Sequence, residues 1–230
     1  MNATTAKPAE QSRDSAATAW RRALELTAPI PHHPERILPT VIEELAAELG
    51  EKPAVLSDRE CLTYGTLAER SNQYARWALD RGLAKGDCVC LFMPNRPEYL
   101  AVWLGITKVG GVVALLNTHL AGASLARSIN IVAPKHVIAA AELVDRLITA
   151  IPDLTVAPTI WSHGDNHAAL PRINRDIERY SGEMLDRQEH RPPTIDDRAL
   201  YIYTSGPPAC PRRPTSATVV SCNGATGLPA

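Results

Sequence analysis

The chain has 230 residues, of which 45% are hydrophobic and 21% charged, as is usual for a soluble globular protein of one or two domains. A net charge of −1 offers no basic surface for nucleic acid. Five irregularly spaced cysteines form no disulfide framework, which favours a reducing cytoplasm.

The N-terminal segment is polar. Met1–Ala17 lacks an apolar stretch, so it is not a secretory signal, and its composition predicts disorder. The most apolar run, Ala101–Leu116, is interrupted by Lys108 and two glycines, and it is shorter than the roughly 20 residues of a membrane helix. We therefore expect a cytoplasmic protein without a transmembrane segment, whose only membrane contact would be peripheral, at the inner face.

Two helices are predicted before the regular part of the chain begins. Trp20–Leu26 is the first, and Val41–Leu49 is the second, with Gly50 as its C-cap. From Pro53 onward the pattern changes. Ala54–Leu56 is a short predicted strand, and Arg59–Thr63 is expected to pair with it.

Helical and strand patterns then alternate. Cys88–Met93 is apolar at every position, as expected for a parallel strand buried on both faces. The predicted helices are 66–81, 97–109, 124–132 and 142–150, and the predicted strands are 88–93, 112–115 and 136–140. This order predicts an α/β fold, a mostly parallel sheet flanked by helices on both faces, with right-handed crossovers.

The segment 151–198 is rich in Pro, His, Asn, Asp and Arg, and it shows little periodicity. A short helix is expected at Arg175–Tyr180. The chain then returns to the sheet as a strand at Arg198–Tyr203.

This last strand runs into Thr204, Ser205 and Gly206, which are the candidate phosphate-binding residues. Backbone N–H groups and hydroxyls bind anions, and glycine permits a close approach. The same tripeptide also forms ordinary turns. The residues that follow, PPACPRRP at 207–214, provide no lysine, and Pro207 and Pro208 have no N–H to donate.

Several ordered segments carry a family resemblance. They are LTYGTL at 62–67, KGD at 85–87, MPNRPEY at 93–99 and VGGV at 109–112, followed by LLNT at 115–118 and APKH at 133–136. Together with the Thr-Ser-Gly segment, they resemble the N-terminal part of acyl-CoA synthetases of the adenylate-forming (AMP-binding) superfamily. The likeness covers about residues 53–206 and is strongest to the fatty-acid-transport-protein branch.

This resemblance implies ATP-dependent activation of a long- or very-long-chain fatty acid, with Mg²⁺ and coenzyme A as further requirements. The partners would be small molecules: the fatty acid, ATP and CoA. In that family the catalytic Lys, the Mg²⁺-binding Glu and the ribose-binding Asp lie in later motifs, so we expect no catalytic or metal-binding residue in this chain.

Other polar residues are expected to be structural. Glu98, Asn95 and Asn117 are interpreted as turn, capping or strand-end residues, although the two asparagines could also face a ligand at the strand ends. His163 and His167 are expected at the surface, as are His32 and His33. None of the histidines has metal-ligand spacing.

The residues after Gly206 are consistent with a shifted reading frame. If one nucleotide was lost between codons 206 and 207, the remaining bases permit the sequence TTGLPKAANVSHRRVMQWSYWFAG. Its start completes the phosphate loop of the resembled family. The alternative is an original proline-rich disordered tail.

The expected organisation is a disordered segment at 1–17, a helical lead-in at 18–52, a partial synthetase domain at 53–206 and an aberrant, disordered tail at 207–230. We predict an incomplete domain that is inactive alone and binds none of its cofactors productively. The alternatives are a non-catalytic nucleotide- or acyl-binding module and an adenylating enzyme for another carboxylic acid.

Overall fold

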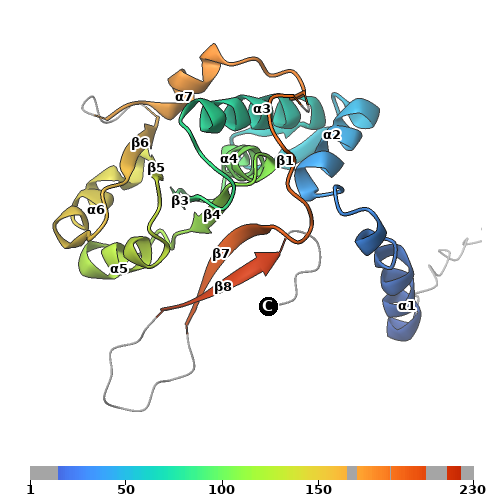
Figure 1. Cartoon of the computed structure of the whole chain (residues 1–230), viewed down its shortest axis with the longest axis horizontal. Coiled ribbons are helices and arrows are strands. Elements are labelled where there is room, and N and C mark those ends of the chain that lie inside the picture. Colours follow the sequence, from blue (N-terminus) through green and yellow to red (C-terminus); the bar gives the residue numbers. More distant parts are fainter. Residues whose placement is uncertain (1–14, 165–169, 187, 206–216, 224–230) are drawn as a thin grey trace, which may run out of the picture. The chain divides into compact units, whose positions relative to one another are not determined.

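Helix α1 (Ala16–Thr27) is the first element of the computed structural model, which describes residues 15–164, 170–186, 188–205 and 217–223 (Figure 1). The Oγ atom of Ser15 caps α1 by accepting from the N–H of Thr18 at 3.2 Å. The helix therefore starts before the predicted Trp20. A short 3₁₀ turn, η1 (Ile30–His32), follows. These elements belong to a compact unit (1–33) that is separate from the rest of the chain.

The second unit (34–230) opens with α2 (Leu38–Leu49), which ends at Gly50 as predicted. Gly50 has a φ of +43°, a conformation that favours glycine. Strands β1 (Pro53–Leu56) and β2 (Cys61–Thr63) then pair antiparallel, also as predicted.

The central sheet has six strands in the order β6-β5-β3-β4-β7-β8. The pairings from β6 across to β7 are all parallel, and β8 is antiparallel to β7. This confirms the predicted α/β fold. The strands are β3 (Cys88–Phe92), β4 (Val112–Leu115), β5 (His136–Ala140), β6 (Thr159–His163), β7 (Arg198–Ser205) and β8 (Ala217–Asn223).

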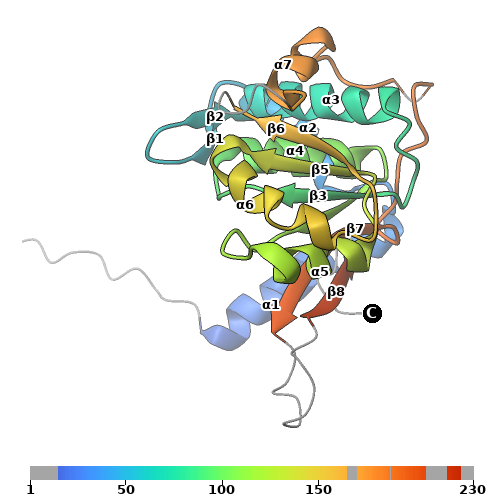
Figure 2. The same ribbon diagram turned by 90° about the vertical axis from the view of Figure 1, so that its left-hand side faces the viewer.

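Helices cover both faces of the sheet (Figure 2). Successive residues of β3 point to opposite faces, so Val89 and Leu91 join one core while Cys88 and Cys90 join the other. The first core packs against α3 (Tyr64–Asp80) and α4 (Pro97–Lys108). The second packs against α5 (Gly122–Val132) and α6 (Val144–Ile148), which follows a 3₁₀ turn, η2 (Ala141–Leu143).

Helices α3 and α4 approach each other closely at Gly105. A Cβ atom built there would lie 2.5 Å from both the Ser71 carbonyl oxygen and the Tyr74 Cβ. Only glycine therefore fits this crossing. At the start of α3, Thr63 and Thr66 form a reciprocal capping box, which sets the first turn of the helix.

Strand β6 lies in the segment that was expected to be irregular. It pairs with β5 over its whole length, from Thr159 beside His136 to His163 beside Ala140. The polar residues Thr159, Ser162 and His163 interrupt the alternation that would predict a strand. The hydrogen bonds to β5 stabilise the extended conformation, although the local strand propensity is weak. The 3₁₀ turn η3 (Ile151–Asp153) precedes this strand. Helix α7 (Ile173–Asp176) and the 3₁₀ turn η4 (Ile177–Arg179) follow it, in place of the single helix expected at 175–180.

The tail was expected to lack regular structure, but it contains strand β8. Residues 217–223 pair with β7 in antiparallel register from Ser205–Ala217 to Arg198–Asn223. The run Thr218-Val219-Val220 is β-branched, and the outer side of β7 offers unpaired backbone groups to such a segment. The remainder of the tail lies outside the described residues, as do residues 1–14 of the expected disordered start.

Across the described parts of the chain, none of the helices combines the length and apolar character needed to traverse a bilayer.

Candidate functional site

The connections of the sheet reverse direction at β3. Strand β4 pairs on one side of β3, and the chain then crosses back so that β5 pairs on the other side. The connecting helices α4 and α5 consequently lie on opposite faces of the sheet. Strands β3 and β5 thus flank the switch point, and their carboxyl ends lie at the edge of the sheet where open α/β folds bind their ligands.

A pocket of about 300 Å³ opens at this edge. It is formed by the residues that follow β3, by Tyr99 in the first turn of α4, and by the residues that follow β4. The lining residues are Met93, Pro94, Asn95, Tyr99, Leu116, Asn117 and Thr118. We call this group the edge pocket.

The edge pocket presents neutral polar groups from exposed turns. Asn95 and Asn117 are both exposed. The Oδ1 atom of Asn117 accepts from the N–H of His119 at 2.9 Å, so this residue also stabilises its own turn, as predicted. Burial raises the pKa of Tyr99 to about 12, which keeps its phenol neutral and able to donate at neutral pH.

The predicted phosphate-binding residues lie at the end of the neighbouring strand. Leu115 of β4 pairs with Ile202 of β7, and Asn117 and Thr204 each follow two residues later. Strand β7 continues two residues beyond the predicted Tyr203, since Thr204 and Ser205 pair with Thr218 and Ala217. Gly206 lies outside the described residues.

A buried carboxylate, Glu98, holds the first turn of α4 beside the edge pocket. Its two oxygens accept from Nε and Nη2 of Arg70 at 2.8 and 2.7 Å, and Oε1 also accepts from the Tyr74 hydroxyl at 2.5 Å. Nε2 of His163, at the end of β6, lies 3.6 Å from Oε1. Glu98 is thus an anchor between α3, α4 and β6, rather than the turn or cap residue that the sequence suggested.

The charge of Glu98 is stabilised by these contacts. Burial acts to raise the pKa of this carboxyl, but the contacts with His163, Arg70 and Tyr74 outweigh it and lower the pKa to about 2. Burial, together with the charge of Glu98, raises the pKa of Tyr74 well above its usual value. The group is therefore a fixed ion pair at neutral pH, which suits structural support and not proton transfer.

The same contact corrects the expectation for His163, whose side chain is largely buried and was expected at the surface. His32 and His33 are exposed as expected, and His167 lies outside the described residues. Among the residues that the structure describes, no three or more His, Cys, Asp or Glu side chains gather as metal ligands would.

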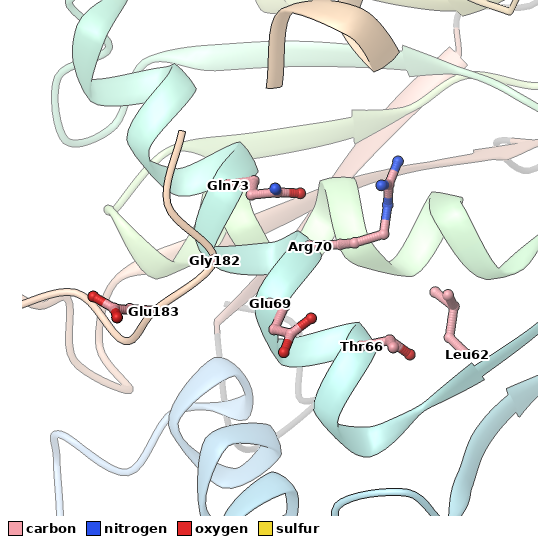
Figure 3. A pocket seen from close by; sticks show the side chains of 7 residues that line it. All are labelled: Leu62, Thr66, Glu69, Arg70, Gln73, Gly182 and Glu183. Carbon is pink, nitrogen blue, oxygen red and sulfur yellow. The ribbon is translucent and has the colours of Figure 1, made fainter. Parts of the chain in front are cut away.

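A larger pocket of about 570 Å³ lies over α3 and shares no lining residue with the edge pocket (Figure 3). The guanidinium of Arg70, which lines this pocket, is already ion-paired with Glu98, and Nε2 of Gln73 donates to the Tyr180 carbonyl at 3.3 Å. Glu69, Arg70 and Glu183 point in different directions rather than toward one centre. The edge pocket is therefore the better candidate site.

The described lining of the edge pocket suits hydrogen-bonding groups rather than the charges of a triphosphate. Arg96, which follows Asn95, is ion-paired with Glu142, and Nη1 of Arg146 donates to the Thr118 carbonyl at 2.7 Å. These cations are engaged within the protein. The described residues that line the pocket include no Lys or Arg, so these residues alone would leave several charges of a triphosphate unbalanced.

A parallel α/β sheet with a polar pocket at the carboxyl ends of its strands is an architecture that suits the binding of a small-molecule ligand. The chain belongs to the family of AMP-binding enzymes, the adenylate-forming ligases, because the model of that family matches residues 42–207, well over half of its length. Enzymes of this family use ATP and small-molecule acids, and its CoA ligases also use coenzyme A, typically with Mg²⁺.

The curated relatives include long-chain fatty acid transport proteins. Protein 2 of Rattus norvegicus is 33% identical over 186 residues, which cover 79% of this chain and 30% of that protein. Protein 6 of Mus musculus is 28% identical over 196 residues, which cover 83% of this chain and 32% of that protein. The chain thus spans about a third of the length of these relatives.

Solved structures show the same fold. An anthranilate CoA ligase in complex with anthranoyl-AMP superposes with a TM-score of 0.70 at 16% identity, covering 80% of this chain and 34% of that one. A benzoate CoA ligase from Burkholderia xenovorans LB400 gives 0.64 at 20% identity, with the same coverage. The described sheet and helices thus match the N-terminal subdomain of adenylate-forming enzymes.

Proposed function

We propose that the chain is the N-terminal part of an ATP-dependent ligase that joins long- or very-long-chain fatty acids to coenzyme A. The observation that supports this is the 33% identity to a long-chain fatty acid transport protein over 186 residues. In such a ligase the fatty acid carboxylate attacks the α-phosphate of ATP, releasing pyrophosphate and forming an acyl-adenylate. The thiol of coenzyme A then attacks the acyl carbon and displaces AMP.

Within this proposal, Thr204, Ser205 and Gly206 begin the phosphate-binding loop. Thr204 and Ser205 end the strand beside β4, at the same edge as the edge pocket. The family match ends at residue 207, where the sequence departs from the loop of the resembled family. The domain boundaries 18–52, 53–206 and 207–230 are part of the same proposal.

The chain by itself is proposed to be inactive. PPACPRRP at 207–214 provides no lysine for the phosphates and lacks two N–H donors. The arginines beside the edge pocket, Arg96 and Arg146, are engaged with Glu142 and with the Thr118 carbonyl. Among the described residues beside the edge pocket, these two cations are therefore already paired and less able to stabilise the phosphoryl transition state.

Fatty-acid-dependent ATP–pyrophosphate exchange tests the inactivity. With palmitate or a very-long-chain acid, the purified chain should give no exchange above buffer, and benzoate or anthranilate should give none either. Exchange with an aromatic acid alone would instead identify an adenylating enzyme for another carboxylic acid. Exchange with a fatty acid would refute the proposed inactivity.

Calorimetry with ATP tests the loop. A variant in which residues 207–230 are replaced by TTGLPKAANVSHRRVMQWSYWFAG should bind ATP more tightly than the parent chain, since it regains the loop lysine and its N–H donors. Equal affinities of the two proteins for ATP would argue against a phosphate-binding role for the replaced segment. Sequencing the DNA across codons 206 and 207 tests the frame directly, because an additional base there would open the synthetase frame.

The proposed ligase acts in the cytoplasm, peripheral to the inner face of the membrane. Long-chain fatty acids partition into bilayers, so an enzyme that uses them gains substrate by lying at the membrane surface.

A further inference from the structure

Helix α1 exposes its large apolar side chains. The exposed fractions are 67% for Trp20, 52% for Leu24 and 70% for Leu26. None of the residues of this helix is buried. Within the described part of their unit, residues 15–33, the apolar groups of α1 therefore join no core.

These side chains are ordered around the helix axis. With about 100° between successive residues, Trp20, Leu24 and Leu26 fall on one half of the circumference, which alanines complete. Arg21 borders this half on the side of Leu24, and Arg22 borders it on the side of Leu26. The opposite half carries Glu25 near its centre.

This arrangement suits the surface of an anionic bilayer. An arginine at each margin can lay its aliphatic stem along the apolar face while its guanidinium reaches lipid phosphate. The carboxylate of Glu25 faces water, away from the lipid. Tryptophan is also a favoured residue at the headgroup level.

A second copy of the chain fits the same face less well. In paired helices, the positions that flank the apolar seam carry charges that complement those of the partner. Here both flanking positions are arginines, and Glu25 lies too far round the helix to pair with them. Self-association would place like charges together.

We propose that α1 lies in the headgroup region of an anionic phospholipid membrane, with Trp20, Leu24 and Leu26 inserted and with Arg21 and Arg22 on lipid phosphates. The choice of a bilayer as partner rests on the charges that border the apolar face and on the proposed function, in which the ligase lies at the membrane surface. The vesicle binding measured below requires no ligase activity.

The test measures binding of the full chain to vesicles of phosphatidylcholine mixed with phosphatidylglycerol, and to vesicles of phosphatidylcholine alone. Sedimentation gives the partition coefficient, and a blue shift of tryptophan fluorescence reports insertion. The chain should bind the mixed vesicles more tightly. No ATP, fatty acid or CoA is present, so the outcome is independent of the ligase proposal.

A matched pair of substitutions locates the contact. Leu26→Ala should lower the partition coefficient about fivefold, because part of one leucine side chain no longer leaves water. Leu56→Ala, at the exposed end of β1, should leave it unchanged, although Leu56 is as exposed as Leu26, at 69%. Both variants should keep the circular dichroism spectrum of the parent.

Charge is tested separately. Arg21→Gln and Arg22→Gln should each weaken binding to mixed vesicles about fivefold, and added salt should shrink this effect. The proposal is overturned if the chain fails to bind mixed vesicles, or if Leu56→Ala weakens binding as much as Leu26→Ala. It is equally overturned if Leu26→Ala dissolves a dimer seen by ultracentrifugation while no vesicle binding occurs.

Discussion

Replacing Glu98 by glutamine should destabilise the fold strongly. The substitution keeps the size of the side chain but removes the charge that Arg70 and Tyr74 contact. The side chain of Glu98 is only 9% exposed, so water cannot replace the carboxylate as the hydrogen-bond acceptor of Arg70 and Tyr74. Arg70, at 30% exposed, would be left without its counter-ion.

The size of the effect follows from the pKa of Glu98. A fall from its usual value of 4.5 to about 2 means that the folded state favours the charged form. At about 1.4 kcal/mol for each tenfold change, this corresponds to about 3 kcal/mol of unfolding free energy. That is close to the range for removing one partner of a buried ion pair.

Urea unfolding at pH 7, followed by circular dichroism, measures this difference. Glu98→Gln should lower the unfolding free energy by about 3 kcal/mol. The control is Glu48→Gln, which changes an exposed carboxylate on α2 and should have little effect. Equal stabilities of the two variants would refute the account of Glu98 as a buried anchor.

The same pair of proteins gives a pH dependence with a definite sign. Because the pKa of Glu98 is lowered in the folded state, its contribution is fully present above pH 4.5 and is lost as the pH falls toward 2. The stability gap between the parent chain and Glu98→Gln should therefore narrow over that interval. A gap that stays constant down to pH 2 would contradict an ionised Glu98.

Further predictions concern packing and cysteine exposure. Gly105→Ala should lower the unfolding free energy by about 2 kcal/mol, since a Cβ would clash with α3. Gly65→Ala is its control, because a Cβ there meets its nearest neighbour at 3.5 Å, and urea unfolding should show no loss. Peptide-resolved alkylation of the native chain should label exposed Cys61 quickly and leave buried Cys88 and Cys90 protected, burial having raised the pKa of Cys90 well above its usual value. Equal labelling of all three would refute the burial of β3.

The alternation of helical and strand patterns was sufficient to predict the class of fold. Cys88–Met93 is apolar throughout, and the sheet places β3 at its centre, with a core on either face. Such hydrophobic patterns depend only on residues near one another in the sequence. They can therefore be recognised without knowing which strands and helices pack against the segment. The family resemblance, carried by short ordered motifs, was equally accessible.

Strand β6 shows where local pattern was insufficient. Thr159, Ser162 and His163 have no clear alternation, and their strand exists through pairing with β5. Strand β8 makes the same point, because it depends on the open side of β7. Partners of this kind are far apart in sequence, and only the assembled sheet brings them together.

The sequence by itself determined the layered α/β architecture, the family, and a strand that leads into Thr204 and Ser205, which the structure includes in β7. Only the tertiary structure decided the role of Glu98, which the sequence suggested was a turn or capping residue. Its partners Arg70 and Tyr74 lie 28 and 24 residues away, and His163 lies on a strand that the pattern did not reveal. The charge of a buried carboxylate depends on which groups the fold places around it, and no local pattern encodes that placement.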